Sequence, residues 1–288
     1  MIRMRDKMKE LVYLNGWMGS FAEANISVND RGYIFGDGIY EVIRAYNGKM
    51  FALRDHLERL RVSASAVEIE LPGGEKNIGN ICEELMSESG IKEAMVYIQL
   101  SRGTAPRNHT FDAGIKPNLL VTVRHVPEIP ATMYSEGIKV ITHPDLRWQM
   151  CNVKSISLQA NILAKDKALK RGAEEAVFVM EDGTVTEAAS SNVFIIKQGI
   201  LKTHPNGNKI LPGITRRYVI QIAKSMDLEV REEPFSATEL KAAEEVFCTN
   251  TIHEVAPVTK VDDIEIGDGN TGPWTERLLA GYQALISV

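Results

Sequence analysis

Lys154 is the residue of this sequence best placed for covalent chemistry. It lies within residues 145–158, and the nearest charged side chains on either side of it are Arg147 and Lys165. An apolar and neutral setting disfavours the ammonium form of a lysine, so its amine can act as a nucleophile near neutral pH. The alternative is a solvated lysine at the start of a helix, which is the commoner situation for this residue type.

Residues 211–216 have the features of an anion-binding helix start. Pro212-Gly213 precedes a helical pattern, and a glycine allows a ligand to approach the backbone closely. The first turn of the helix offers unpaired N–H groups at the positive end of the helix dipole, and Thr215 adds a hydroxyl group. Arg59, on an earlier helix, would add a cation, although a solvated helix arginine fits that position equally well.

Glu187 completes a set of three parts. It lies within residues 184–192, among small and β-branched residues, which is an unusual setting for a solvated carboxylate. A reactive lysine, an anion cradle and a carboxylate that can pair with a ring nitrogen are the parts that a pyridoxal 5′-phosphate site requires. The three segments together therefore indicate such a site.

Composition excludes several other classes of protein. The chain has 288 residues, of which 44% are hydrophobic, and a net charge of −5, so it can bury a large core and has no basic field for nucleic acid. Its three cysteines lack paired spacing, and residues 1–10 lack the apolar core of a secretory signal. No apolar run approaches the roughly 20 residues that span a bilayer. We therefore expect a soluble, cytoplasmic protein with no membrane partner.

Three common binding motifs are missing from the sequence. Gly36-Asp37-Gly38 begins like a dinucleotide-binding fingerprint, but position 41 is Glu and the segment lies between β-type stretches. No Walker A motif is present, and the six histidines lack the spacing of metal ligands. We therefore expect neither a dinucleotide nor a metal ion.

Helical and β-type patterns alternate along the chain. Asn15-Gly16 and Asn47-Gly48 predict two hairpins in the first third of the sequence. The predicted helices cover residues 54–67, 75–89, 157–171, 214–226 and the chain from 274 onward. The predicted strands cover residues 94–100, 118–123, 137–142, 176–180, 184–188, 192–196, 200–203 and 246–249. This order, without a regular βαβ repeat, predicts an α+β fold with mostly antiparallel sheets.

Pro127 and Pro130 indicate a domain boundary because proline removes a backbone donor and disfavours helix before it. We predict a linker at residues 126–132. It would join an N-terminal α+β domain at residues 1–125 to a C-terminal cofactor-binding domain at residues 133–288.

Six blocks of the sequence resemble those of the fold-type IV pyridoxal phosphate enzymes, the class IV aminotransferases. They occur in the family's order and are spread over nearly the whole chain, at residues 30–41, 56–60, 153–155, 185–194, 211–216 and 254–258. The resemblance implies a two-domain homodimer, with the active site between the domains and near the subunit interface.

The resemblance also implies a role for individual residues. Lys154 would be the Schiff-base lysine and proton shuttle, and Glu187, the second catalytic residue, would pair with the ring nitrogen of pyridoxal 5′-phosphate. The implied cofactor-binding residues are Arg59, Glu187, Ser191, Asn192, Leu211, Ile214, Thr215 and Thr251. The implied substrate-binding residues are Tyr40, Arg107, His109 and Asn250.

Residues 97–111 distinguish between members of the family. If this segment is extended, Arg107, His109 and Phe111 share one face, and an arginine beside an imidazole makes a carboxylate trap. The segment resembles the carboxylate-binding loop of the D-amino-acid aminotransferases, which reaches in from the neighbouring subunit. Tyr40 would complete the trap from its own subunit. The implied reaction transfers the amino group of a D-amino acid such as D-alanine to a 2-oxo acid such as 2-oxoglutarate.

Three alternatives remain open at this point. A branched-chain L-amino-acid aminotransferase is one, because Pro212 and residues 267–273 look closer to those enzymes and Asn250 stands where the D-specific members have serine. An aminodeoxychorismate lyase of the same fold is the second. A non-catalytic anion-binding protein is the third, and the presence of Lys154, Glu187 and Arg59 argues against it.

Overall fold

A computed structural model describes residues 9–287, which divide into two compact units. The first unit runs to Pro127 and includes Val153–Ser157, and the second contains Glu128–Asn152 and the chain from Leu158 onward. The sequence predicted a single crossing between domains, whereas the chain returns to the first unit at Val153–Ser157, the segment that carries Lys154. Most of the N-terminal segment used to argue against a secretory signal lies outside the described residues.

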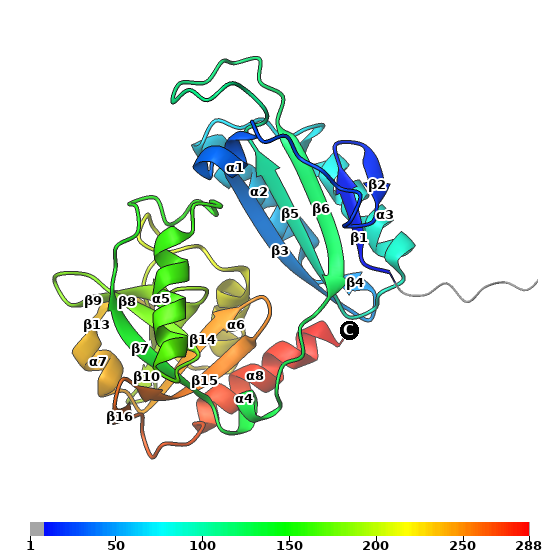
Figure 1. Ribbon diagram of the computed structural model, residues 1–288. Coiled ribbons are helices and arrows are strands. Elements are labelled where there is room, and N and C mark those ends of the chain that lie inside the picture. The colour runs from blue at the N-terminus through cyan, green and yellow to red at the C-terminus, as the bar shows by residue number, and fades with distance from the viewer. Residues whose placement is uncertain (1–8, 288) are drawn as a thin grey trace, which may run out of the picture. The chain divides into compact units, whose positions relative to one another are not determined.

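The first unit is an antiparallel sheet with two helices on one face (Figure 1). Its elements are β1 (Leu11–Leu14), β2 (Trp17–Gly19), α1 (Arg31–Phe35), β3 (Gly38–Tyr46), β4 (Lys49–Met50), α2 (Leu53–Ala66), α3 (Gly74–Ser89), β5 (Ala94–Ser101) and β6 (Asn118–His125). The strand order is β2-β1-β6-β5-β3-β4, and α2 and α3 lie behind the sheet in the view of Figure 1.

The core of the first unit follows from alternation along the strands. Ile39 and Ile43 of β3 are fully buried, and Leu60 of α2 and Leu85 of α3 join them in one hydrophobic cluster. Each such side chain contributes about 1.5–3 kcal/mol when it leaves water. Tyr40 and Val42 alternate with them in β3 and face the other side of the sheet, so this face is free to carry chemistry.

Both hairpins predicted in this unit are confirmed. Asn15 and Gly16 connect β1 to β2 with φ of 49° and 94°, and Asn47 and Gly48 connect β3 to β4 with φ of 50° and 82°. Two successive residues with positive φ are what a tight hairpin turn requires, and Asn-Gly adopts them at low cost.

The second unit is a mixed sheet with helices packed against it (Figure 1). Its strands are β7 (Ile138–Pro144), β8 (Glu175–Val179), β9 (Thr184–Ala188), β10 (Asn192–Lys197), β11 (Ile200–Thr203), β12 (Glu229–Glu232), β13 (Phe235–Ser236), β14 (Glu245–Asn250), β15 (Glu254–Val261) and β16 (Ile264–Glu265). Its helices are α4 (Thr132–Ser135), α5 (Gln159–Lys170), α6 (Ile214–Ser225), α7 (Ala237–Lys241) and α8 (Pro273–Ile286).

The strand order of this sheet is β12-β11-β10-β14-β15-β7-β8-β9-β13, with β16 beside β15. Parallel pairing is confined to β11 with β12 and to β7 with its neighbours β15 and β8, so the prediction of an α+β fold with mostly antiparallel pairing is confirmed. Within residues 9–287, no helix combines the length and the apolar composition needed to cross a bilayer.

Candidate active site

Lys154 lies on a short extended segment that pairs with the open edge of β3. The Tyr40 N–H donates to the Lys154 carbonyl at 2.9 Å, and the Ile156 N–H donates to the Gly38 carbonyl at 3.1 Å. Val153 is 4% exposed and belongs to the core of the first unit. Because neighbours in an extended chain point to opposite sides, burial of Val153 directs Lys154 away from this core.

The amine of Lys154 lies over the ring of Tyr40. Lys154 Nζ is 4.4 Å from the ring centroid, and the Tyr40 ring is 5.7 Å from that of Tyr97 on the adjacent strand. The Tyr97 hydroxyl donates to Gln99 Oε1 at 2.6 Å. The first unit therefore brings together two of the residues assigned from sequence, the reactive lysine and one member of the carboxylate trap.

Arg59 is held by a buried acid that the sequence analysis did not assign. Arg59 Nε and Nη2 donate to the two oxygens of Glu41 at 2.7 and 2.8 Å, and His56 Nδ1 lies 2.8 Å from Glu41 Oε2. Burial raises the pKa of Glu41, but Arg59 lowers it by more, to about 2. A bidentate pair with a buried carboxylate fixes the plane of the Arg59 guanidinium.

The pKa of His56 lies below its usual value, mainly because the ring is buried and also because Arg59 and Lys154 add positive charge nearby. Lys154, Arg59 and His56 therefore belong to one electrostatic group. The missed signal was Glu41 itself, a charged residue at an inward position of an alternating strand, since a buried charge needs a partner.

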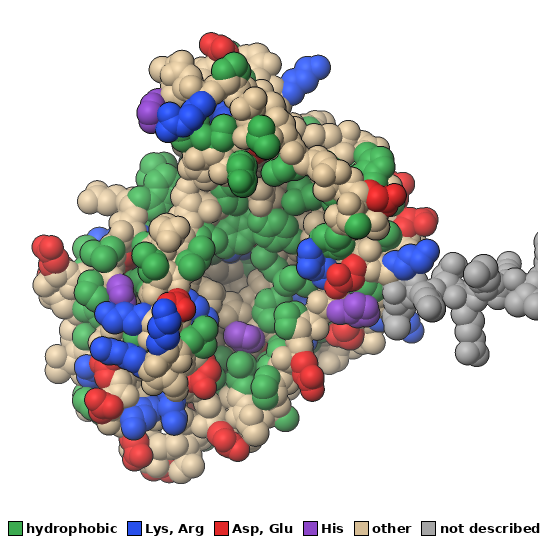
Figure 2. Space-filling model, viewed as in Figure 1, with side chains coloured by type: hydrophobic (Ala, Val, Ile, Leu, Met, Phe, Trp, Pro, Cys, Tyr) green, Lys and Arg blue, Asp and Glu red, His purple; other side chains and the backbone are tan. Residues whose placement is uncertain are grey.

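Arg107 and His109 lie on the loop between β5 and β6, which projects beyond the end of the sheet in Figure 1. Basic and histidine side chains gather at this loop in the space-filling view (Figure 2). Both side chains are exposed and contact Phe35: the Arg107 guanidinium carbon lies 5.2 Å from its ring centroid and the imidazole of His109 lies 5.6 Å from it. The expected extended segment is instead an irregular loop, held together by contacts that sequence periodicity does not report.

Glu187 of the second unit is surrounded by donors. Arg147 donates Nη1 to Glu187 Oε1, and Asn192 Nδ2 and the Leu211 N–H donate to Oε2 at 3.1 and 3.0 Å. Arg147 also makes a bidentate pair with Asp145. Burial alone would raise the pKa of Asp145 and lower that of Arg147, but the hydrogen bonds and opposite charges outweigh it, so the pKa of Asp145 is lowered and that of Arg147 is raised. Both groups are therefore charged at neutral pH, and Arg147 favours the ionised form of Glu187.

The helix start predicted at residues 211–216 is the N-terminus of α6. Gly213 is its N-cap, no side chain caps the first turn, and Ile214 and Thr215 are buried there. A Cβ on Gly213 would lie 2.0 Å from Asn192 Oδ1, so only glycine allows the chain to pass this close to β10. Asn192 also donates to the Leu211 carbonyl at 2.9 Å and thereby ties this helix start to Glu187.

The turn that follows β14 is organised by Asn250. Its Oδ1 accepts from the N–H groups of Ile252 and His253 at 2.9 and 2.7 Å, which shapes the turn containing Thr251. Its Nδ2 donates to Ser191 Oγ at 2.9 Å, and Ser191 donates to the buried Glu175 at 3.3 Å. The second unit thus joins Ser191 and Asn250 directly, and it joins Asn192, Leu211 and Glu187 in a neighbouring network.

Comparison with known proteins agrees with these features. The profile of the family described as "Amino-transferase class IV" matches residues 38–261. D-alanine aminotransferase of Staphylococcus haemolyticus is 42% identical over 276 residues, which covers 96% of this chain and 97% of that protein. The D-alanine aminotransferase of Listeria monocytogenes is 40% identical over 270 residues, or 93% of each chain.

Solved structures lead to the same family. The branched-chain amino acid aminotransferase of Escherichia coli superposes with a TM-score of 0.90 at 26% identity and covers 96% of this chain and 94% of that one. A second branched-chain amino acid aminotransferase, solved in complex with N-(5′-phosphopyridoxyl)-L-glutamate, has a TM-score of 0.90 at 27% identity, over 98% and 95% of the two chains. The chain belongs to the class IV aminotransferases. It is a pyridoxal-phosphate-dependent aminotransferase.

The residues present fit this cofactor. The uncapped first turn of α6 offers backbone N–H groups to a phosphate, and the close approach at Gly213 leaves room for no side chain there. Glu187, paired with Arg147, suits a protonated ring nitrogen. Lys154 supplies the amine that an aldehyde requires. The roles assigned to single residues from sequence remain predictions.

Proposed function

We propose that this enzyme transfers the amino group of D-amino acids such as D-alanine to a 2-oxo acid such as 2-oxoglutarate. The observation that carries the proposal is the exposed pair Arg107 and His109, a cation and an imidazole held against one phenylalanine. The relatives that are 42% and 40% identical over nearly the whole chain are D-alanine aminotransferases, which favours the same substrate class. The two branched-chain enzymes compared above are more distant, at 26% and 27% identity.

The position of the trap relative to the lysine would set the stereochemistry. The Cα–H bond of the substrate must point toward Lys154 Nζ for the proton to be removed. With that bond fixed, the two enantiomers differ by exchanging the positions of carboxylate and side chain. A cationic trap on one side of the site therefore accepts the carboxylate of only one enantiomer.

The other residues of the site would each have a separate role in the reaction. Bound pyridoxal phosphate supplies an electron-withdrawing ring that stabilises negative charge at the substrate Cα. Lys154 Nζ takes the proton from that carbon, with Tyr40 beneath it. Glu187 would keep a proton on the ring nitrogen, while the start of α6, Thr251 and Arg59 would hold the phosphate.

A donor–acceptor panel with both enantiomers tests the proposal. We expect D-alanine with 2-oxoglutarate to give abundant pyruvate, and kcat/KM for D-alanine to exceed that for L-alanine or L-leucine by at least roughly 10²-fold. This ratio follows because losing two charge-assisted bonds to a misplaced carboxylate costs about 1.5–3 kcal/mol each. A preference for L-leucine would instead indicate a branched-chain enzyme. Pyruvate release from aminodeoxychorismate without a second oxo acid would indicate a lyase.

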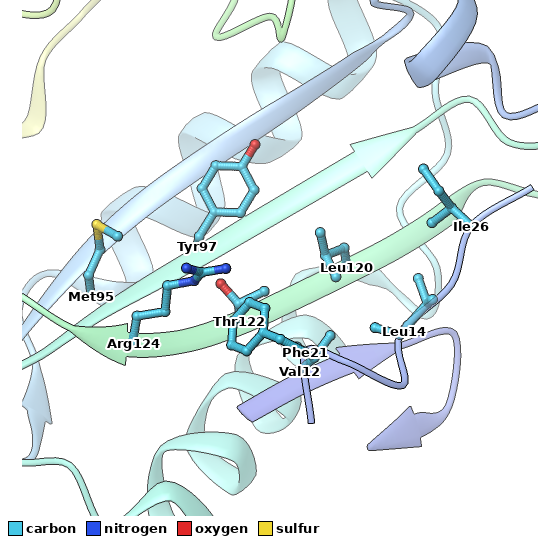
Figure 3. A pocket seen from close by; sticks show the side chains of 10 residues that line it. Val12, Leu14, Phe21, Ile26, Met95, Tyr97, Leu120, Thr122 and Arg124 are labelled. Carbon is cyan, nitrogen blue, oxygen red and sulfur yellow. The ribbon is translucent and has the colours of Figure 1, made fainter. Parts of the chain in front are cut away.

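We further infer that the enzyme acts as a homodimer. The sheet face of the first unit opposite α2 and α3 carries a cavity of about 350 Å³, lined by mostly apolar side chains of β1, β5 and β6 (Figure 3). Leu120 and Met95 line it, together with Phe21, whose ring lies 3.8 Å from the Arg124 guanidinium. An exposed apolar face of this kind is typical of a surface that a protein partner covers. A second copy would cover it, as the family resemblance implies.

The mass of the wild-type enzyme in solution tests the homodimer. Light scattering should give twice the chain mass of 32.0 kDa. Leu120→Glu should shift the equilibrium toward a single chain, because the interface would bury an unpaired charge. Val62→Glu, on an exposed position of α2, is the matched control and should leave the mass at the dimer value. A wild-type mass near one chain contradicts the inference.

The compartment we propose is the cytoplasm, whose reducing conditions suit three free thiols.

A further inference from the structure

The loop between β5 and β6 is fixed at its base. Gly103 has φ of +115°, and a Cβ there would lie 2.0 Å from the Lys116 carbonyl oxygen, so the two ends of the loop pass each other in contact. The Arg31 N–H donates to the Gly103 carbonyl at 2.9 Å. The loop therefore leaves the sheet from a closed neck, which only glycine at position 103 permits.

Arg31 holds the middle of the loop from within the first unit. Its side chain is 5% exposed, Nε donates to Asp37 Oδ2 at 2.8 Å, and Nη1 donates to the carbonyls of Asn108 and Thr110 at 2.6 and 3.4 Å. These two carbonyls flank His109. A buried guanidinium thus fixes the backbone on both sides of a residue whose side chain is exposed.

Arg102 holds the same loop from a second direction. Its Nε donates to the same oxygen of Asp37 at 2.8 Å, and its guanidinium carbon lies 3.7 Å from the centroid of Phe111. Burial raises the pKa of Asp37, but hydrogen bonds and charge from the two arginines lower it by more, so the group is ionised at neutral pH. One carboxylate therefore positions two arginines, and each arginine contacts the loop.

Phe35 provides the surface on which the exposed charges rest. It ends α1, a helix capped by the Asp30 side chain at one end and by Gly36 with φ of +68° at the other, so the ring is carried by a well-defined element. The guanidinium carbons of Arg31 and Arg107 lie 4.9 and 5.2 Å from the ring centroid. The imidazole of His109 lies 5.6 Å away.

We propose that Phe35 and Arg31 are positioning residues that hold Arg107 and His109 ready to bind the substrate carboxylate. The proposal rests on the proposed function, because it assigns a carboxylate to these two side chains. A free arginine on an exposed loop would lose its rotamer freedom when it binds a ligand, and that loss weakens affinity. Contact with Phe35 removes part of this freedom before the substrate arrives, and the backbone bonds from Arg31 keep His109 beside Arg107.

Phe35→Leu tests the proposal because it removes the ring and keeps an apolar side chain. We expect KM for D-alanine and for 2-oxoglutarate each to rise about tenfold, since both substrates present a carboxylate to the same trap. We expect kcat and the dissociation constant of pyridoxal phosphate to stay within about twofold, because the chemistry and the phosphate site use other residues. Phe35→Tyr restores a ring and should return both KM values close to those of the wild type.

Trp274→Leu is the matched control, since its ring lies under Arg277 on α8 at 4.0 Å and it should change none of these constants. Unchanged KM values in Phe35→Leu would overturn the proposal, as would a rise accompanied by an equal loss of cofactor affinity. If Phe35→Leu does not fold, Phe35→Met gives the same test. Failure of the proposed function is separate: it appears in the wild type as a preference for L donors, whereas the KM for 2-oxoglutarate reports on Phe35 for either enantiomer.

Discussion

Lys154→Ala is expected to abolish transamination, with a fall in kcat of at least about 10⁴-fold. The variant enzyme would lose both the amine that bonds to the cofactor and the base that removes the Cα proton. Proton transfer alone typically contributes about 10²–10⁴-fold to the rate. The effect should be measured in a single half-reaction, by following the cofactor absorbance after D-alanine is added. Added methylamine should restore part of the rate, because it replaces the missing amine.

Lys170→Ala is the control for this substitution. Lys170 lies at an exposed position of α5 and pairs with Asp166 at 2.6 Å, so its loss should leave the half-reaction within about twofold of the wild-type rate. Borohydride treatment should attach the cofactor irreversibly to the wild-type enzyme and to Lys170→Ala. Covalent attachment in Lys154→Ala would show that another lysine carries the cofactor and would contradict the assignment.

The buried Glu41–Arg59 pair should make the first unit sensitive to acid. Glu41 is fully buried and its pKa is lowered from 4.5 to about 2 in the folded protein. A pKa lower in the folded than in the unfolded state means that the unfolded chain binds the proton first. The pair therefore stabilises the fold fully above about pH 4.5, and its contribution of about 3 kcal/mol is lost as the pH falls toward 2. His56, whose pKa is also lowered, changes stability in the same direction at higher pH.

Glu41→Gln isolates this contribution. At neutral pH the variant should be less stable than the wild type by about 3 kcal/mol, because Arg59 is left without its counter-ion. As the pH falls, the wild-type glutamate becomes neutral too, so the difference between the two proteins should shrink. Urea unfolding between about pH 7 and pH 3, followed by a signal from the first unit, measures the difference.

The control pair for this prediction lies on the surface of the same unit. Arg61 Nε and Glu75 Oε1 are 2.8 Å apart, but the two side chains are 49% and 35% exposed, so Glu75→Gln should change the free energy of unfolding by less than about 1 kcal/mol. A stability difference for Glu41→Gln that is independent of pH would contradict the low pKa of Glu41. It would assign the loss to packing instead.

Local signals in the sequence were sufficient to predict most of the helices and strands. The Asn-Gly turns and the helices α2, α3 and α6 lie within one or two residues of their predicted bounds, because turn chemistry and apolar periodicity are properties of neighbouring residues. The strand β15 was missed. It contains Pro257 opposite Phe247 in the interior of a sheet, a position that local preference disfavours and that only its neighbours β14 and β7 can stabilise.

Prediction of the candidate active site from the sequence met the same limit. Lys154 and Glu187 could be selected from sequence because their surroundings and the family resemblance single them out. Arg147 was noted only as the nearest charge to Lys154, although it donates to Glu187, and Glu41 received no role, although it holds Arg59. Both pairings join residues far apart in the chain, so no spacing rule reports them. The role of Arg31 could not be predicted from the sequence either, because its hydrogen bonds to the carbonyls of residues 108 and 110 form only when the loop folds back.

The five residues Val153–Ser157 have a consequence for how the protein can be made and divided. A fragment that ends at Pro127 would lack the backbone that satisfies the edge of β3 at Gly38 and Tyr40, and an open strand edge invites association with other chains. On the ribosome, the N-terminal unit stays incomplete until residue 157 has emerged. Neither half of the gene encodes a finished module, so a recombinant design that splits the enzyme must carry this peptide with the N-terminal piece.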